Sequence, residues 1–345
     1  MKITFRSPSN LAIVKYWGKY GRQLPRNASI SFTLNDAYSE TSLEYKEKED
    51  DSEITLDFYF EGKQNEAFGK RILKFLNSVS DELPFLKQYH LTIHSHNSFP
   101  HSAGIASSAS SMSALALCLC RMEQQVAYTL PAEEMFYRRA SYFSRLASGS
   151  ACRSVYPYAA SWGVTNHIAG SSDEYATACA SALHDVFKTF HDDILIISQH
   201  EKSVSSSAGH ELMEGNPFAP LRYELADKNL GKLMQAFSEG DLETFGTIAE
   251  EEALMLHALM MTSHPSYILM EGGSVEAIKK VRNFRNDTKL PLYFSLDAGP
   301  NLHLLYPDNI TEQVKPFIKE ELSKFCESGR VIEDSVGRGA FEIKE

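Results

Sequence analysis

The stretch that most suggests ligand chemistry in this 345-residue chain is residues 99–113, where a run of small residues leads into a helical pattern. Small residues allow a backbone to approach a ligand closely, and Gly104 can adopt positive φ angles. Ser107 and Ser108 would lie at the start of the helix, where free N–H groups and the helix dipole favour a bound phosphate. No Gly-Lys-Ser or Gly-Lys-Thr follows, so the stretch is not a Walker loop. An ordinary serine-capped helix with an alanine-rich packing face explains it equally well.

Two other segments could supply positive charge to such a ligand. Lys15 and Lys19 flank Tyr-Trp-Gly, and because Trp-Gly is a poor helix interior, a turn could present both ammonium groups together. Arg153 follows the small-residue turn Ser148-Gly-Ser150, and hydroxyls beside a guanidinium suit a carboxylate or a phosphate. The structural alternatives are a solvated lysine pair and a helix–helix turn with a surface arginine.

A carboxylate, Asp297, ends an apolar run and precedes Ala-Gly-Pro-Asn301. At the end of a strand, directly before a turn, its side chain can project into a cleft. An aspartate that stabilises the turn itself is the common alternative.

The elements that position these residues follow from the hydrophobic periodicity. Helices are predicted at residues 64–79, 107–121, 218–238, 241–261 and 273–287, with another that starts at Pro131. Strands are predicted at residues 27–34, 41–45, 54–60, 89–95, 155–170, 192–198, 291–297 and 302–306. Residues 203–215 are polar and contain glycine, so we expect a mobile turn there. Residues 175–191 link two blocks of different pattern, which predicts domains at 1–185 and 186–345.

Composition limits the possible partners. The net charge of −11 argues against nucleic acid and anionic membranes, so an anionic substrate would need cations gathered locally. No apolar run is long enough to span a membrane, and the N-terminus has no apolar signal core, so we expect a cytoplasmic protein. The five cysteines are scattered without metal-ligand spacing, which predicts reduced thiols.

Four segments, taken in order, resemble the mevalonate diphosphate decarboxylases of the GHMP kinase superfamily. The segments are Asn10-Leu-Ala-Ile-Val-Lys-Tyr-Trp-Gly-Lys19, Phe99-Pro-His-Ser-Ala-Gly-Ile-Ala-Ser-Ser-Ala109, Ser148-Gly-Ser-Ala-Cys-Arg-Ser154 and Asp297-Ala-Gly-Pro-Asn301. The resemblance implies an α+β fold with an N-terminal ribosomal-protein-S5-like domain, a C-terminal ferredoxin-like domain and an active site in the cleft between them. It also implies a homodimer.

The activity implied by the resemblance is ATP-dependent decarboxylation of mevalonate 5-diphosphate, in isoprenoid biosynthesis, with Mg²⁺ as a cofactor. Asp297 would orient the 3-hydroxyl group and accept its proton, with Lys15 beside it, while Arg153 and Asn10 would place the substrate carboxylate. The 5-diphosphate end would be held by Tyr16, Lys19, Ser148 and Ser150, so that these four residues and Arg153 would bind the substrate. ATP would be held by Ser102, Ala103, Gly104, Ile105, Ala106, Ser107, Ser108 and Asn97, with Ser108 also on the metal.

The sequence also departs from the family pattern, at His101-Ser102, at Pro157-Tyr158 and at Leu302-His303. These changes leave the size of the anion pocket open, so a substrate with a single phosphate stays an alternative. A kinase without decarboxylation is a second alternative, although Lys15, Arg153 and Asp297 together disfavour it. A non-catalytic nucleotide-binding homologue would be expected to have lost one of these side chains.

Overall fold

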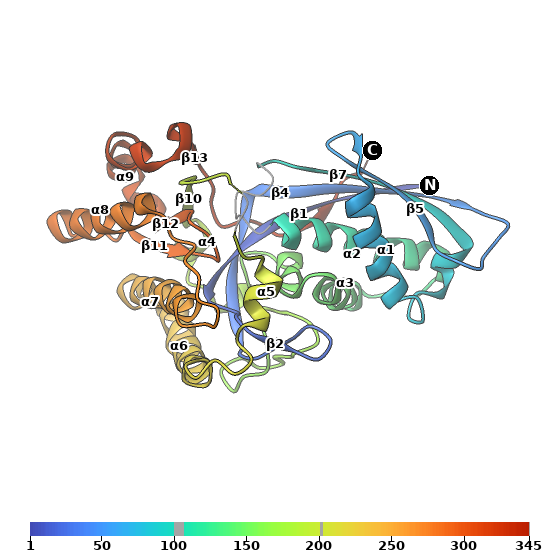
Figure 1. The fold of residues 1–345 in the computed structure, drawn as a ribbon, viewed down its shortest axis with the longest axis horizontal. Coiled ribbons are helices and arrows are strands. Elements are labelled where there is room, and N and C mark those ends of the chain that lie inside the picture. Colours follow the sequence, from blue (N-terminus) through green and yellow to red (C-terminus); the bar gives the residue numbers. More distant parts are fainter. Residues whose placement is uncertain (100–106, 201–202, 345) are drawn as a thin grey trace.

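The computed structural model describes residues 1–99, 107–200 and 203–344, which form two β-sheets with helices packed against them (Figure 1). The larger sheet runs in the order β14-β1-β4-β7-β5-β6, and β8 and β9 extend it beside β4. Its strands are β1 (Lys2–Val14), β4 (Ser29–Glu47), β5 (Thr55–Phe60), β6 (Lys63–Gln64), β7 (Tyr89–Asn97), β8 (Ala159–Trp162), β9 (Thr177–Ala178) and β14 (Phe341–Glu342).

Helices from the first half of the chain pack against the larger sheet. α2 (Ser107–Ala127) packs against β1, β4 and α3 (Glu133–Ala147), and α1 (Glu66–Ser78) packs against β5. α1 begins where the Asn65 side chain accepts the N–H of Phe68, and its apolar stripe includes Ile72 and Phe75. The small residues in α2 let this buried helix lie close to the two longest strands.

The smaller sheet comes from the second half of the chain and is antiparallel, in the order β11-β12-β10-β13. Its strands are β10 (His191–Leu195), β11 (Tyr293–Leu296), β12 (Leu302–Tyr306) and β13 (Val331–Ile332). The helices of this half are α4 (Asp185–Lys188), α5 (Ser206–Glu211), α6 (Ala219–Glu239), α7 (Leu242–Met261), α8 (Gly272–Thr288) and α9 (Thr311–Phe317). A short hairpin of β2 (Lys19–Tyr20) and β3 (Leu24–Pro25) lies apart from both sheets.

The two halves share a hydrophobic core. Phe32 on β4 lies with its ring centre 5.4 Å from that of Phe237 on α6 and 5.7 Å from that of Phe245 on α7. The C-terminal strand β14 also returns to pair with β1 of the larger sheet. The expected domain boundary at residue 185 stays a prediction.

The predicted elements differ from the structure in three places. The strands expected at residues 27–34 and 41–45 are one continuous strand, β4, and only Ala159–Trp162 is a strand in the predicted segment 155–170. The mobile turn expected at residues 203–215 is wrong, because α5 forms there. Its start is fixed by Ser205, whose side chain accepts the N–H of Ala208. None of the described helices is long and apolar enough to cross a membrane.

Candidate active site

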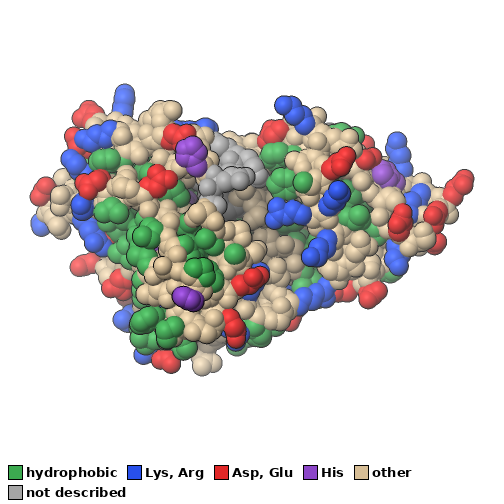
Figure 2. Space-filling model, viewed as in Figure 1, with side chains coloured by type: hydrophobic (Ala, Val, Ile, Leu, Met, Phe, Trp, Pro, Cys, Tyr) green, Lys and Arg blue, Asp and Glu red, His purple; other side chains and the backbone are tan. Residues whose placement is uncertain are grey.

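A cavity of about 720 Å³ is lined by residues from both halves of the chain. Figure 2 shows the molecule hollowed between the two halves on this face. Most of the residues singled out from the sequence line it: Asn10, Lys15, Tyr16, Lys19, Asn97, Ser107, Ser108, Ser148, Ser150, Arg153 and Asp297. The remaining predicted residues, Ser102, Ala103, Gly104, Ile105 and Ala106, lie outside the described part of the chain, as does His101.

Asp297 and Lys15 meet across this cavity although they lie 282 residues apart. Lys15 directly follows β1, and its ammonium nitrogen lies 2.9 Å from Oδ1 of Asp297, which follows β11. The Lys15 side chain is 1% exposed, whereas that of Asp297 is 25% exposed. The carboxylate is therefore accessible from the cavity and lies against a buried positive charge.

Buried polar side chains fix the main chain of Lys15. Its N–H donates to Oε2 of Glu252 at 2.8 Å, and its carbonyl oxygen accepts from Nδ2 of Asn27 at 2.9 Å. Glu252 is fully buried and also pairs with Arg222, at 2.5 Å, and accepts from Asn229. This cluster sets the point from which the Lys15 side chain reaches Asp297.

We predict that Arg222→Met lowers the free energy of unfolding by about 3–5 kcal/mol, because it leaves the Glu252 charge buried and unpaired. Denaturant unfolding measures this loss. The matched control is Arg26→Met, which removes the exposed ion pair between Arg26 and Glu214 and should cost less than about 1 kcal/mol. Equal losses in the two variants would contradict the anchoring role of the buried pair.

Arg153 lines the same cavity as Asp297 and is only 2% exposed. Its guanidinium donates from Nε to Ser31 Oγ at 2.8 Å, from Nη1 to Ser29 Oγ at 2.6 Å and from Nη2 to Asn10 Oδ1 at 3.3 Å. Burial lowers the pKa of Arg153, and the negative charge of Asp297 opposes that shift. Neutral hydroxyl and amide acceptors hold the guanidinium without neutralising it, so its charge can act on an anionic ligand.

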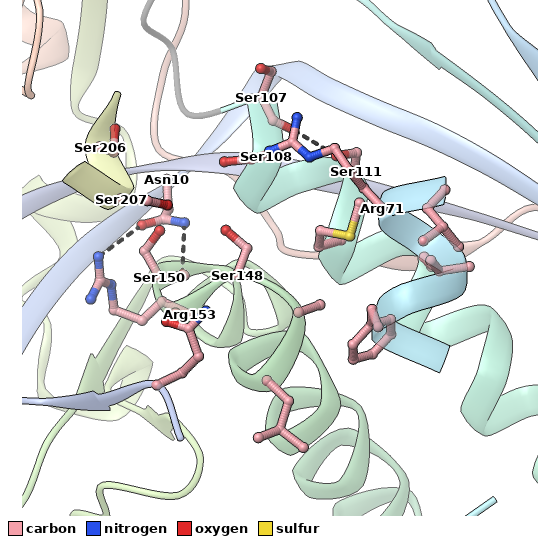
Figure 3. Close-up of a pocket in the computed structure, with 18 of the residues that line it drawn as sticks. Asn10, Arg71, Ser107, Ser108, Ser111, Ser148, Ser150, Arg153, Ser206 and Ser207 are labelled. Atoms are coloured by element: carbon pink, nitrogen blue, oxygen red, sulfur yellow. Dashed lines mark hydrogen bonds between the residues drawn. The ribbon is translucent and has the colours of Figure 1, made fainter. Parts of the chain in front are cut away.

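Asn10, which also lines the cavity, is hydrogen-bonded to the Arg153 guanidinium. Its Nδ2 donates to Ser154 Oγ at 2.8 Å and to the carbonyl oxygen of Ser150 at 3.3 Å, while its Oδ1 accepts from Arg153 (Figure 3). The contacts make Asn10 a support for Arg153. Its predicted contact with a substrate carboxylate stays a prediction.

The Ser148–Ser150 turn faces the Tyr16–Lys19 turn. α3 ends at Ser148, and a short 3₁₀ helix, Gly149–Val155, follows. A Cβ on Gly149 would lie 3.1 Å from both the Tyr16 hydroxyl and the Trp162 ring, so glycine allows the close approach. Burial raises the pKa of Tyr16, which keeps its hydroxyl neutral and able to donate.

The described part of α2 begins at Ser107, beside the cavity. Ser107 and Ser108 project their hydroxyls from this first turn, and Arg71 of α1 points toward it (Figure 3). Five basic side chains line the cavity against the single carboxylate of Asp297 among the described lining residues: Lys15, Lys19, Arg71, Lys74 and Arg153. The locally gathered cations expected for an anionic substrate are therefore present despite the acidic chain.

Two family models match this chain almost from end to end. The Diphosphomevalonate decarboxylase-like N-terminal domain matches residues 7–176, and the Mevalonate 5-diphosphate decarboxylase C-terminal domain matches residues 193–338. The chain belongs to the diphosphomevalonate decarboxylase family. This membership agrees with the resemblance seen in the four sequence segments.

Individual members of the decarboxylase family are similar over most of the chain. Diphosphomevalonate decarboxylase of Debaryomyces hansenii is 28% identical over 331 residues, covering 92% of this chain and 82% of the relative. Mevalonate diphosphate decarboxylase from Staphylococcus aureus has a TM-score of 0.84 at 27% identity, covering 99% of this chain and 98% of that one. MDDEF, solved in complex with MVAPP, AMPPCP and magnesium, has a TM-score of 0.84 at 28% identity, covering 100% and 99%. The predicted GHMP kinase fold is confirmed.

The donors at the start of α2 fit a magnesium ion that is shared with phosphate. No group of three His, Cys, Asp or Glu side chains placed to hold a metal occurs in the described residues. Mg²⁺ commonly takes most of its ligands from phosphate oxygens and water, with only one or two from protein. The Ser108 hydroxyl lines the cavity and is an oxygen donor of the kind that can supply one such protein ligand.

The residues of α5 that line the cavity were not predicted from the sequence. Ser206, Ser207 and His210 of α5 line it, but their segment was expected to be a turn. Arg71 was missed as well, because a basic residue on an amphipathic helix is typical of a solvated face.

His210 makes the stability of the fold depend on pH. Burial, with the positive charge of Lys19, lowers the pKa of its imidazole from 6.5 to about 3. Between these values the unfolded chain binds more protons, so the free energy of unfolding contributed by His210 is complete above pH 6.5 and falls as pH falls. We predict a loss of about 2 kcal/mol from this group between pH 7 and pH 5.

Denaturant unfolding across that pH range measures the effect. His210→Asn should remove this part of the pH slope, whereas the control His94→Asn, at an exposed position on β7, should keep it. The same slope in wild type and His210→Asn would contradict the prediction.

Proposed function

We propose that this chain catalyses the ATP-dependent decarboxylation of mevalonate 5-diphosphate to isopentenyl diphosphate, ADP, phosphate and CO₂. The observation that carries the proposal is the meeting of Asp297, Lys15 and Arg153 in one cavity beside the start of α2. The names of the relatives, and the ligands of MDDEF, support the same reaction.

The first step is transfer of the γ-phosphoryl group of ATP to the tertiary 3-hydroxyl group. Asp297 accepts a hydrogen bond from this hydroxyl, aims its oxygen at phosphorus and takes its proton as the O–P bond forms and ADP leaves. Because an aspartate is a weak base at neutral pH, orientation contributes more than proton abstraction. The Lys15 ammonium holds the carboxylate in place.

The second step is loss of phosphate and CO₂. The bond between C3 and the phosphorylated oxygen breaks with its electron pair leaving on phosphate. The bond to the carboxyl carbon then supplies the electrons of the new alkene, and CO₂ departs. Arg153 orients the carboxylate, and because that group loses its charge as the reaction proceeds, a grip that is too tight would favour the ground state.

The two ends of the cavity differ in chemistry. Tyr16, Lys19, Ser148 and Ser150 supply donors and charge for the 5-diphosphate end. Ser107 and Ser108 at the helix start suit the phosphates of ATP, and Ser108 is our candidate to hold Mg²⁺, which when bound would neutralise charge on phosphate oxygens. The apolar end, which includes Phe68, suits the adenine ring, and Asn97 can contribute a polar contact.

Assays of CO₂ and ADP with purified protein test the proposal. With mevalonate 5-diphosphate, ATP and Mg²⁺ we expect one CO₂ for each ADP. ADP without CO₂ would make the chain a kinase. Turnover only with mevalonate 5-phosphate would replace the substrate but keep the chemistry, and trapped product without ATP consumption would point to a non-catalytic homologue.

We also propose that the protein is a cytoplasmic homodimer. Gel filtration with light scattering measures the mass in solution and so tests the dimer.

A further inference from the structure

His210 joins the C-terminal half of the cavity wall to the Tyr16–Lys19 turn. Its Nδ1 accepts the main-chain N–H of Gly18 at 2.9 Å. The imidazole ring also packs against two neighbours in that turn, with its centre 4.4 Å from those of Tyr16 and Trp17. One side chain of α5 therefore contacts three consecutive residues that precede Lys19.

The Tyr16–Lys19 turn is closely packed against α5 and α6, so it has little freedom to move independently of His210. A Cβ on the neighbouring Gly209 would lie 2.5 Å from the Trp17 ring, so α5 lies directly against the turn. Gly18 itself has a φ of +97°, and a Cβ there would lie 2.2 Å from the hydroxyl of Tyr223 on α6. The turn is thus held between two helices of the C-terminal half, in a conformation that favours glycine.

The hydrogen bond defines the state of the ring. A nitrogen that accepts an N–H must be unprotonated, so the neutral imidazole carries its proton on Nε2. The low pKa, caused by burial and by Lys19, keeps this form through the neutral range. The ring is therefore a constant acceptor for Gly18 and adds no positive charge beside Lys19.

We propose that His210 is a positioning residue for the phosphate end of the substrate. His210 anchors the main chain of Gly18 and packs on the Tyr16 ring. It thereby sets the directions of the Tyr16 hydroxyl and of the Lys19 ammonium group, whose residue directly follows Gly18. This inference rests on the proposed function, because Tyr16 and Lys19 bind the 5-diphosphate only in that reaction. The consequence is that affinity for the phosphorylated substrate depends on α5. This helix belongs to the C-terminal half, whereas Tyr16 and Lys19 belong to the N-terminal half.

A matched pair of amide variants tests the role of Nδ1. His210→Asn presents an amide oxygen close to the position of Nδ1 and can still accept from Gly18. His210→Gln carries the same amide one carbon further out, near Nε2, and cannot. We expect His210→Gln to raise KM for mevalonate 5-diphosphate about tenfold, with KM for ATP changed less than about twofold, and His210→Asn to stay close to wild type.

A double-mutant cycle shows whether the effect passes through Lys19. Added to Lys19→Met, His210→Gln should raise KM by clearly less than the tenfold seen alone, because one of the two misplaced groups is already absent. Full additivity, equal KM in the two amide variants, or an equal rise in KM for ATP would overturn the proposal. Thermal unfolding of both amide variants excludes general loss of structure as the cause.

The wild type separates failure of this inference from failure of the proposed function. A wild type that releases no CO₂ from mevalonate 5-diphosphate contradicts the function alone. The same variants are then compared by calorimetry with inorganic pyrophosphate, for which His210→Gln should bind more weakly than wild type and His210→Asn should not. Equal affinity of all three proteins for pyrophosphate would overturn the role of His210.

Discussion

Asp297→Asn is expected to lower kcat at least about a hundredfold while ATP binding persists, since losing one charge-stabilising contact in such a site costs about 3 kcal/mol. The amide keeps the size of the side chain but cannot take the proton of the 3-hydroxyl group. It also breaks the ion pair in which Lys15 lies 2.9 Å from the carboxylate. Steady-state rates of CO₂ release, with ATP affinity from calorimetry, measure the two halves of the prediction.

The matched control for Asp297→Asn is Asp185→Asn, the same chemical change at a side chain that is 90% exposed and pairs with Lys188. This variant should turn over at the wild-type rate. Near-normal turnover in Asp297→Asn would remove Asp297 from the mechanism. Loss of ATP binding in that variant would instead assign Asp297 to nucleotide binding.

Arg153→Met is expected to have the second-largest effect, lowering kcat about a hundredfold or more while weakening substrate binding only modestly. Its guanidinium is held by Ser29, Ser31 and Asn10, all neutral, so its charge is directed to the ligand. Methionine fills part of the same volume without the charge. CO₂ release and the dissociation constant of mevalonate 5-diphosphate separate catalysis from binding.

A buried arginine can also be needed for folding, so Arg153→Lys is measured beside Arg153→Met as a conservative variant. Lysine keeps the positive charge but loses the planar fork, so we expect partial activity. The exposed Arg138 on α3 provides the control Arg138→Met, which should be fully active. An Arg153→Met protein that decarboxylates at the wild-type rate would show that the carboxylate is bound elsewhere.

Short-range patterns in the sequence were enough to find many of the residues around the cavity. Lys15, Arg153 and Asp297 each follow a recognisable local pattern, and their meeting was inferred from the family resemblance. The amphipathic helices were predicted for the same reason, since the stripe that includes Ile72 and Phe75 repeats with the helical period.

Residues fixed by distant partners could not be predicted in this way. Glu252 was not singled out from the sequence, yet it accepts the main-chain N–H of Lys15, which lies 237 residues earlier in the chain. The expected contact of Asn10 with the substrate stays a prediction, but no local pattern indicated that its amide also bonds to Ser150, Ser154 and Arg153. Such contacts depend on how β1, the 3₁₀ helix Gly149–Val155 and α7 pack, which local composition does not determine.

α5 shows how tertiary packing overrides local pattern. Its six residues include two serines and a glycine, a composition typical of turns. Ser205 caps its first turn, and the Trp17 ring packs against Gly209. The glycine that suggested a turn is the residue that lets this helix lie against the N-terminal half.

The fate of the oxygen on C3 of the substrate tests the central claim most directly, because the account requires that oxygen to be phosphorylated before it leaves. Mevalonate 5-diphosphate labelled with ¹⁸O at the 3-hydroxyl group is turned over with unlabelled ATP, and the released phosphate is analysed by mass spectrometry. The account predicts one ¹⁸O atom in each phosphate released. Unlabelled phosphate, with the ¹⁸O recovered in water, would contradict it.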